Sequence, residues 1–351
     1  MKLENARTAA APGPRLFRSE PDRPMAMLRQ CPAYQATPLR QLPKLAEELG
    51  IGTLTVKDET QRMRLGSFKA LGGVFAIAQM LQDAYRGDDL TSPQARKVAA
   101  GMTFITASAG NHGLSVAAGA RIFGARGLIV LSNSVPEGFA ERIRKTGSYV
   151  VRVDGSYEDC VQYAINAAEE NGWLLLADGS WEGFTERPAL IMEGYTVLPE
   201  ECRQEFEKTG MWPTHVFLQA GVGGLAGAVA AHIRDHWAVQ PNIIVVEPEA
   251  APCLLKSVEA GQLTRADGPA SNMGRLDCKD ASLIAFDALR RDADLFVTVP
   301  DEKAREAARL YAAEEIVTTP SGAAPLAALK ILQPGPDARC LLIATEGPEQ
   351  V

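Results

Sequence analysis

Short apolar segments that alternate with longer segments of helical length are the feature that most restricts how this sequence can fold. The apolar segments are nearly continuous runs of Val, Ile, Leu and Ala. Strands that are apolar on both faces and are joined through helices are typical of parallel sheets covered by helices on both sides. The sequence therefore predicts an α/β fold. The apolar segments occupy residues 98–108, 127–133, 148–155, 173–180, 214–221, 242–248, 294–301 and 339–347.

The length of the chain predicts two domains, because 351 residues with 46% hydrophobic side chains suffice for two cores. We expect residues 1–24, rich in Ala, Pro and Arg, to form an extended arm. A large domain of residues 25–73 and 183–351 and a small domain of residues 74–182 are expected to follow. The local pattern predicts a helix over 38–50, one continuous helix over 187–206, and an irregular stretch around 273–280 that leads to the strand at 294–301.

Composition and charge argue against several classes of partner. The 43 acidic residues outnumber the 36 basic ones, and no basic run is interleaved with aromatic residues, so we expect no nucleic-acid partner. No apolar run reaches membrane-spanning length and the N-terminal residues lack the apolar core of a signal peptide, so we expect no membrane partner and a cytoplasmic location. His232 and His236 are expected on a solvated helix face, and no metal site is predicted.

Lys69 lies in the segment LGSFKALGG, residues 65–73, near the start of an expected helix. A lysine amine is a poor nucleophile while it is protonated, so a catalytic role requires burial or neighbouring positive potential. An anionic cofactor held near this lysine would need glycine-rich turns ahead of helices. The chain has such turns further along.

The first turn is SAGNHG, residues 108–113, which follows an expected strand and precedes an expected helix. Ligands of open parallel sheets bind at the carboxyl ends of the strands. Small residues let backbone N–H groups approach an anion such as a substrate carboxylate, and the amide of Asn111 could contact a ring hydroxyl. A turn selected only for helix packing would account for the glycines but not for Asn111 and His112.

The second turn is GVGGL, residues 221–225, again between an expected strand and an expected helix. Three glycines in four residues at a helix N-terminus offer backbone N–H groups that suit a phosphate. The spacing of a dinucleotide site is absent, because position 226 is Ala and Glu247 is the nearest acidic residue to the usual offset. This turn is typical of a monophosphate site.

Asp178 stands at the end of the strand expected over 173–180. A carboxylate at a strand end that faces a cavity can act as a general base. Capping of the next helix or turn is the alternative role for this residue.

These segments, in their order and approximate spacing, resemble the fold-type II pyridoxal 5′-phosphate (PLP) enzymes of the tryptophan synthase β superfamily. Within it, the segments KDET, DGSWEGFTERPALIMEGY, LQAGVGGLAGAV, VEPEAAPCLLKS, MGRLDC, TPSGAA and ATEG resemble the diaminopropionate ammonia-lyase family, over residues 34–347. The resemblance implies two domains, each with a largely parallel sheet covered by helices, and an active site in the cleft between them. It also implies PLP as the cofactor and a homodimer.

Carried over by position, the resemblance implies a set of cofactor contacts. Lys69 would hold PLP as a Schiff base, with Phe68 beside it. Asn111 would contact the 3′ oxygen of the cofactor. The hydroxyl of Thr345 would face the pyridine nitrogen and leave that nitrogen unprotonated, which suits elimination better than transamination. The phosphate would be held by the backbone N–H groups of Gly221, Val222, Gly223, Gly224 and Leu225.

On the substrate side, Ser108, Ala109 and His112 would line the carboxylate pocket, and Asp178 would exchange a proton at Cα or at the leaving group. The sequence departs from the lyase pattern at Ala109. That family usually has an aspartate there, assigned to proton transfer, whereas the turn found here resembles that of serine and threonine dehydratases.

The implied function is PLP-dependent α,β-elimination on a small-molecule amino acid. 2,3-Diaminopropionate is the leading substrate, with pyruvate and ammonia as products. A serine or threonine dehydratase is the alternative that Ala109 supports. A non-catalytic PLP-binding protein is the alternative from another class.

Overall fold

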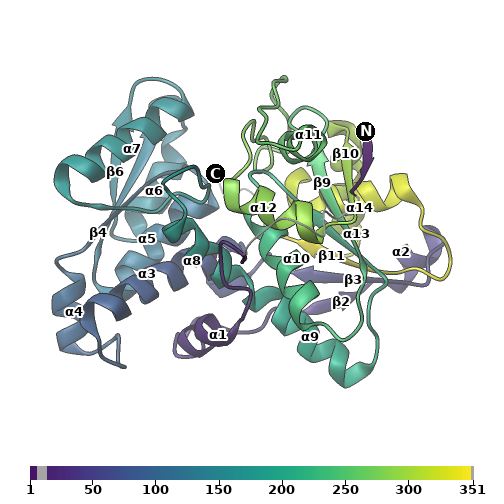
Figure 1. Cartoon of the computed structure of the whole chain (residues 1–351), viewed down its shortest axis with the longest axis horizontal. Coiled ribbons are helices and arrows are strands. Elements are labelled where there is room, and N and C mark those ends of the chain that lie inside the picture. Colours follow the sequence, from purple (N-terminus) through teal and green to yellow (C-terminus); the bar gives the residue numbers. More distant parts are fainter. Residues whose placement is uncertain (6–13, 349–351) are drawn as a thin grey trace.

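The strands form two sheets, one in each lobe of the molecule (Figure 1). The computed structural model describes residues 1–5 and 14–348. Over these residues the larger sheet has seven strands in the order β1-β10-β9-β8-β11-β3-β2, and the smaller has four in the order β6-β5-β4-β7. Neighbouring strands are parallel, except that β1 and β2 run antiparallel to their neighbours at the two edges of the larger sheet. The predicted α/β fold with two largely parallel sheets is therefore confirmed.

The strands of the larger sheet are β1 (Lys2–Glu4), β2 (Leu39–Gln41), β3 (Thr53–Asp58), β8 (His215–Gln219), β9 (Asn242–Pro248), β10 (Leu295–Val299) and β11 (Arg339–Ala344). Those of the smaller sheet are β4 (Thr103–Ala107), β5 (Arg126–Ser132), β6 (Tyr149–Val153) and β7 (Leu174–Leu175).

The helices of the smaller lobe and of the junction are α1 (Asp22–Leu28), α3 (Lys69–Tyr85), α4 (Pro93–Ala99), α5 (Asn111–Phe123), α6 (Glu137–Lys145), α7 (Tyr157–Asn171) and α8 (Glu186–Tyr195). Those of the larger lobe are α2 (Pro43–Glu48), α9 (Val197–Thr209), α10 (Gly224–His236), α11 (Cys253–Ala260), α12 (Leu283–Asp292), α13 (Asp301–Ala313) and α14 (Pro320–Leu332), with a short 3₁₀ helix, η1 (Arg62–Arg64), after β3.

Apolar side chains pack on both faces of each sheet. In the smaller lobe α3 and α5 cover one face, and α7 covers the other through Cys160, Ala164 and Leu175. In the larger lobe α2, α13 and α14 cover one face, while α9, α10 and α12 belong to the core on the other. Central strands such as β4 are buried along their whole length, which is why they appear as continuous apolar runs in the sequence.

Three predictions of local structure are wrong. Residues 39–41 form the edge strand β2, and α2 begins only at Pro43, a residue that suits the first turn of a helix. The helix predicted over 187–206 is two helices that meet at Thr196, because Pro199 lacks the N–H that would continue the ladder and its ring crowds the preceding turn. Helix α12 is present where no helix was predicted, and it packs against α10.

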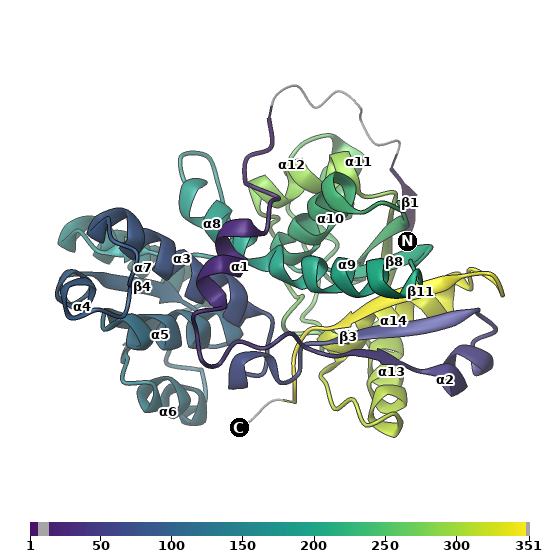
Figure 2. The same cartoon turned by 90° about the horizontal axis from the view of Figure 1, so that it is seen from below.

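The N-terminal segment joins both lobes. Strand β1 pairs with β10, and α1 lies against α3 at the junction of the lobes (Figure 2). Part of the arm expected over residues 1–24 falls on residues 6–13, which lie outside the described residues. The domain boundaries themselves remain a prediction. None of the helices in the described ranges is both long and apolar enough to span a membrane.

His232 is fully buried, so the predicted solvated helix face is wrong for this residue. Its Nδ1 lies 3.1 Å from the carbonyl oxygen of Ser19, and its Nε2 lies 3.3 Å from a carboxylate oxygen of Glu200. The imidazole therefore packs inside the larger lobe, beneath the N-terminal segment.

Candidate active site

Lys69 is the first residue of α3 and points into the space between the lobes, where its side chain is 19% exposed. Its Nζ lies 2.5 Å from Oδ2 of Asp178. The rings of Phe68 and Tyr195 flank the amine, with their centroids 5.3 and 5.8 Å from Nζ. Burial raises the pKa of the Tyr195 phenol to about 12, so this ring is a neutral wall of the site.

Asp178 follows the short strand β7 and its side chain is 24% exposed. The next helix, α8, begins at Glu186 with Thr185 at its N-cap position, so Asp178 does not cap that helix. The carboxylate instead faces Lys69 across the site. The contacts of Asp178 therefore support a role as a general base rather than as a cap.

The Lys69–Asp178 pair is ionised. Burial alone would lower the pKa of Lys69, but the adjacent Asp178 carboxylate outweighs burial and raises that pKa. Burial alone would raise the pKa of Asp178, but Lys69 and then His112 outweigh it and lower that pKa. A proton shared across 2.5 Å can move from Nζ to Oδ2, which leaves the neutral amine that attacks a carbonyl.

The glycine turn, residues 221–225, joins β8 to α10 beside this pair. Gly223 has φ of +98°, and a Cβ there would lie 2.9 Å from Leu254, so only glycine fits without strain. Helix α10 begins at Gly224 with no side-chain cap on its first N–H groups. A Cβ on Gly224 would lie 3.8 Å from the carbonyl oxygen of Asp178, which places the turn next to the ion pair. This uncapped helix start fits a phosphate group.

A buried carboxylate supports the glycine turn from behind. Glu247, at the end of β9, is fully buried and accepts hydrogen bonds of 2.8 Å from the N–H groups of Leu254 and Leu255 at the start of α11. The thiol of Cys253 donates to the carbonyl oxygen of Gly221 at 3.5 Å. Glu247 therefore caps α11, which packs on the turn, and it is not placed as a ribose ligand.

Thr345, which follows β11, lies beside the lysine segment. Its carbonyl oxygen accepts a 3.1 Å hydrogen bond from the backbone N–H of Phe68. Its hydroxyl oxygen accepts from the side-chain amide of Gln219 at 3.2 Å, which leaves the hydroxyl hydrogen available for donation. Such a donor fits an unprotonated pyridine nitrogen, as the resemblance implies.

The SAGNHG turn, residues 108–113, connects β4 to α5 and also reaches the junction of the lobes. A Cβ on Gly113 would lie 2.1 Å from the carbonyl oxygen of Ser108, so glycine is required for this close approach. The side-chain amide of Asn111 donates to a carboxylate oxygen of Glu346, 3.4 Å away on the larger lobe. The hydroxyl of Ser108 accepts from the N–H of Gly110 at 3.3 Å, and Ala109 adds no polar group to the turn.

His112 is buried rather than exposed in the cleft. Its Nε2–H donates to the carbonyl oxygen of Leu176 at 2.8 Å, two residues before Asp178. Burial lowers the pKa of His112, so the imidazole is neutral near neutral pH. The structure thus gives His112 a contact with the segment that carries Asp178, and its contact with a substrate carboxylate remains a prediction.

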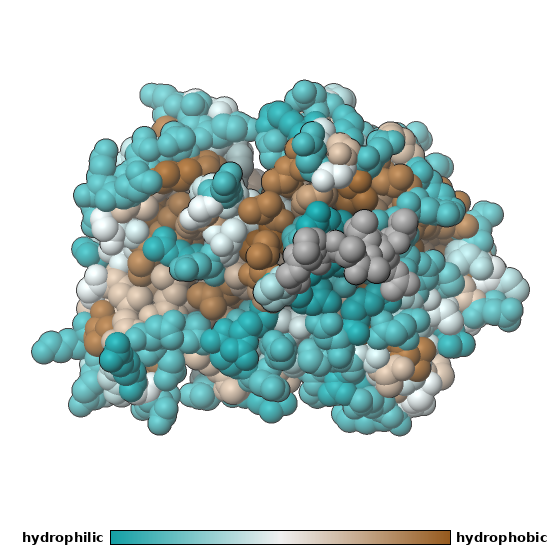
Figure 3. Space-filling model, in the orientation of Figure 1, coloured by the Kyte–Doolittle hydropathy of each residue, from teal (hydrophilic) through white to brown (hydrophobic). Residues whose placement is uncertain are grey.

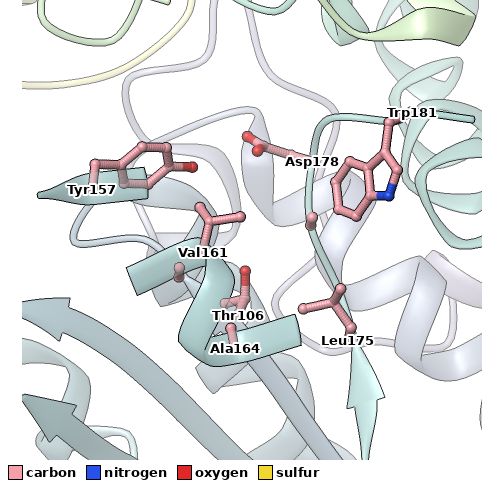
Figure 4. Close-up of a pocket in the computed structure, with 9 residues that line it drawn as sticks. Thr106, Tyr157, Val161, Ala164, Leu175, Asp178 and Trp181 are labelled. Carbon is pink, nitrogen blue, oxygen red and sulfur yellow. The ribbon is translucent and has the colours of Figure 1, made fainter. Parts of the chain in front are cut away.

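A pocket opens beside Asp178 in the smaller lobe (Figure 4). It has an empty volume of about 250 Å³, including its mouth, and Asp178 lies between Tyr157 and Trp181 at this mouth. Apolar residues also reach the molecular surface around the junction of the lobes (Figure 3). The floor of the pocket is apolar and includes Val161, Ala164, Leu175 and Ala177.

Reasoning from the sequence missed Tyr157, Trp181, Tyr195 and Glu346. Tyr195 belongs to the predicted helical segment 187–206, and only the packing of α8 on α3 brings it to Lys69. Glu346 follows Thr345 directly, so the ATEG segment was the one local signal that pointed to it.

The fold and these residues define a PLP-dependent enzyme. The model of the family described as "Pyridoxal-phosphate dependent enzyme" matches residues 31–346, and the chain belongs to this family. The cofactor predicted from the sequence is confirmed.

Comparison with individual proteins narrows the likeness. The chain is 34% identical to diaminopropionate ammonia-lyase of Escherichia coli strain K12, over 91% of this chain and 86% of that protein. A crystal structure of the Escherichia coli enzyme in complex with an aminoacrylate-PLP azomethine reaction intermediate matches 99% of this chain and 93% of that chain, with a TM-score of 0.87 and 30% identity. A crystal structure of a bacterial threonine deaminase matches 94% of this chain and 98% of that chain, with a TM-score of 0.76 and 26% identity. The predicted resemblance to the lyase family is confirmed.

Proposed function

We propose that this enzyme eliminates the β-amino group of 2,3-diaminopropionate and yields pyruvate and ammonia. The observation that carries the proposal is the Lys69–Asp178 pair, 2.5 Å apart beside an uncapped glycine turn. The similarity to diaminopropionate ammonia-lyase over 91% of the chain supports the same substrate. In balance, one diaminopropionate and one water give one pyruvate and two ammonia.

The charge of the site favours a diamino acid over a hydroxy acid. Asp178 carries a negative charge at the mouth of a pocket flanked by Tyr157 and Trp181. A β-ammonium group would be attracted to that carboxylate and to the faces of the two rings, whereas the hydroxyl of serine has no charge to contribute. The pocket therefore discriminates between leaving groups by charge.

The residues of this chain have separable tasks in the proposed reaction. PLP, when bound, withdraws electrons from Cα of the substrate and so makes its proton acidic. Lys69 would bind the cofactor through Nζ, and the backbone N–H groups of residues 221–225 would hold its phosphate. Thr345 would donate to the ring nitrogen. Lys69 Nζ and Asp178 Oδ2 are the proton-carrying atoms that face each other in the site.

A substrate screen tests the proposal. Pyruvate and ammonia are measured with the purified PLP-bound enzyme and both enantiomers of diaminopropionate, both enantiomers of serine, and L-threonine. We expect the highest kcat/KM with diaminopropionate and two ammonia per pyruvate. A clear preference for a hydroxy amino acid, with one ammonia per keto acid, would contradict the proposal.

A serine or threonine dehydratase is the second candidate, and a specific observation favours it. Ala109 gives the turn no carboxylate, as in dehydratases, and a threonine deaminase shares the fold at 26% identity. The screen separates the two candidates directly. Bound PLP without turnover of any of these amino acids would instead support a non-catalytic PLP-binding protein.

Ala109 also bears on stereochemistry. With no carboxylate in residues 108–113, Asp178 is the acidic residue that the structure places against Lys69. We therefore propose that the enzyme processes one enantiomer of diaminopropionate much faster than the other. The Ala109→Asp variant would raise activity with the disfavoured enantiomer, and unchanged selectivity would argue against this part of the proposal.

A homodimer and a cytoplasmic location complete the proposal. The family resemblance supports the first, and the six cysteines, all free thiols, support the second because they suit a reducing compartment. Light scattering of the purified enzyme measures the first, and fractionation of the cells that make the protein measures the second.

A further inference from the structure

Four charged side chains are buried together beneath the loop that carries Lys69. They are Lys57, Glu59, Arg62 and Glu201, and the most exposed of them, Glu201, is 8% exposed. Lys57 lies on β3, Glu59 and Arg62 lie in the turn that follows it, and Glu201 reaches them from α9. Two positive and two negative charges therefore neutralise each other inside the larger lobe.

Arg62 is the centre of this cluster. Its guanidinium donates to both carboxylate oxygens of Glu59, at 2.6 and 2.7 Å, and to both oxygens of Glu201, at 2.8 Å each. It also donates to the carbonyl oxygen of Gln35 and to the hydroxyl of Thr37, both at 2.9 Å. Lys57 donates to Glu201 at 2.6 Å. Every arm of the guanidinium is thus fixed by a partner.

Stability alone does not account for such a cluster. Buried ion pairs can often be replaced by apolar residues of similar volume without loss of stability, because burial of the charges costs about as much as their attraction returns. What the paired guanidinium and carboxylates add is geometry, since a planar fork with two bidentate partners has one orientation. The cluster therefore fixes the position of the backbone at residue 62.

The backbone between Arg62 and Lys69 is in an uncommon conformation that needs such fixing. Met63, Arg64 and Gly66 have φ of 50°, 59° and 76°, and the first two are not glycine. Left-handed residues of this kind persist where the surrounding structure holds them. Beyond the loop, the N–H of Gly347 donates to the carbonyl oxygen of Gly66 at 2.9 Å.

The loop is therefore fixed at both ends, and Lys69 follows directly. On one side Arg62 is held by Glu59 and Glu201. On the other, the segment that contains Thr345 pairs with residues 66–68. A shift at residue 62 would move Lys69 relative to both Asp178 and Thr345.

We propose that Arg62, held by Glu59 and Glu201, is a positioning residue for Lys69. It acts through the loop of residues 63–68 and touches neither substrate nor cofactor. The inference rests on the proposed role of Lys69 as the cofactor-binding lysine. Loss of the guanidinium geometry should then weaken PLP binding and lower kcat without a matching loss of folding stability.

Three variants of graded severity test this. Thr37→Val removes one hydroxyl from the cluster, Arg62→Lys keeps the charge but loses the fork, and the double variant Arg62→Met with Glu201→Leu removes one charge of each sign. The PLP dissociation constant, the absorbance of the lysine–PLP Schiff base, Tm and kcat at saturating PLP are measured for each. We expect a two- to threefold weaker PLP affinity for Thr37→Val, and at least tenfold lower affinity and kcat for the two Arg62 variants.

The matched control is a buried ion pair at the opposite end of the strands. Arg234 and Asp294 lie 2.6 Å apart just before β10, and Arg234→Met with Asp294→Leu should leave PLP affinity and kcat within twofold of wild type even if Tm falls. Variants at Thr37 and Arg62 that bind PLP and turn over like wild type would overturn the inference, as would losses that follow Tm equally in the cluster variants and the control. Wild-type protein that forms no Schiff base at Lys69 would instead overturn the proposed function.

Discussion

The side-chain amine of Lys69 and the carboxylate of Asp178 lie 2.5 Å apart, although the two residues are separated by more than a hundred positions in the chain. Lys69 is the first residue of α3, and Asp178 stands in the loop after β7. The pair gives the site a proton donor and acceptor that face each other. It also ties the start of α3 to the smaller sheet.

Lys69→Ala should abolish turnover and the Schiff-base absorbance of bound PLP, because no other amine is placed against Asp178 in the described residues. Lys69→Arg is the matched control, since it keeps a cation beside Asp178 but forms no Schiff base with the cofactor. Both variants should be inactive, and only Lys69→Ala should lose the ion pair. Spectral titration with PLP and thermal melts measure the two effects. Retained elimination in either variant would refute the assignment.

Asp178→Asn should lower kcat by about 10²–10⁴-fold, the usual contribution of a positioned acid or base. The substitution keeps the size of the side chain, and Asp178 caps no helix, so Tm should change little. Steady-state kinetics and calorimetry on the same preparation measure the two quantities. Normal kcat with a large fall in Tm would show that the role of Asp178 is structural.

Gly223→Ala should weaken PLP binding and destabilise the fold by more than about 1 kcal/mol, because φ is +98° and the new Cβ would lie 2.9 Å from Leu254. Gly224→Ala is the control, since its Cβ would meet its nearest neighbour at 3.7 Å. Equilibrium PLP titration and chemical denaturation distinguish the two variants. Equal effects at the two positions would argue against the strained geometry of Gly223.

Glu247 predicts a decline of stability with rising pH. Burial raises the pKa of Glu247 from 4.5 to about 8, even though two backbone N–H groups favour its charged form. The folded state then holds a proton that the unfolded state has released, so the free energy of unfolding should fall as pH rises from about 4.5 to about 8. Denaturation curves across this range, compared with Glu247→Gln, measure the effect. The variant has no titrating group at this position, so a slope identical to that of wild type would contradict the prediction.

The parts of the site that lie on local sequence signals could be predicted, and the parts that depend on packing between distant segments could not. Lys69 and residues 221–225 are marked by glycine and small residues at strand-to-helix turns, which the backbone itself requires. Tyr195 has no such signal, because it meets Lys69 only through the packing of α8 on α3. The same holds for Arg62, whose partner Glu201 comes from a helix far along the chain.

The errors in the fold have physical reasons of the same kind. Residues 39–41 have a pattern compatible with a helix, and their pairing with β3 decides that they form an edge strand. The break between α8 and α9 follows from Pro199, a local signal that the apolar periodicity concealed. Most strands of the two sheets were predictable, because strands buried on both faces have few polar positions.

The place of β11 in the larger sheet sets an order of events during synthesis. This strand lies between β8 and β3, which have no direct pairing with each other over the described residues. The strands of the smaller sheet are contiguous in the chain and can pair while the ribosome is still translating. The centre of the larger sheet must wait until Arg339–Ala344 has emerged, and Thr345 follows at once. The nascent chain therefore acquires its PLP-binding site only after more than three hundred residues have been made, and until then the exposed edges of β3 and β8 need protection from aggregation.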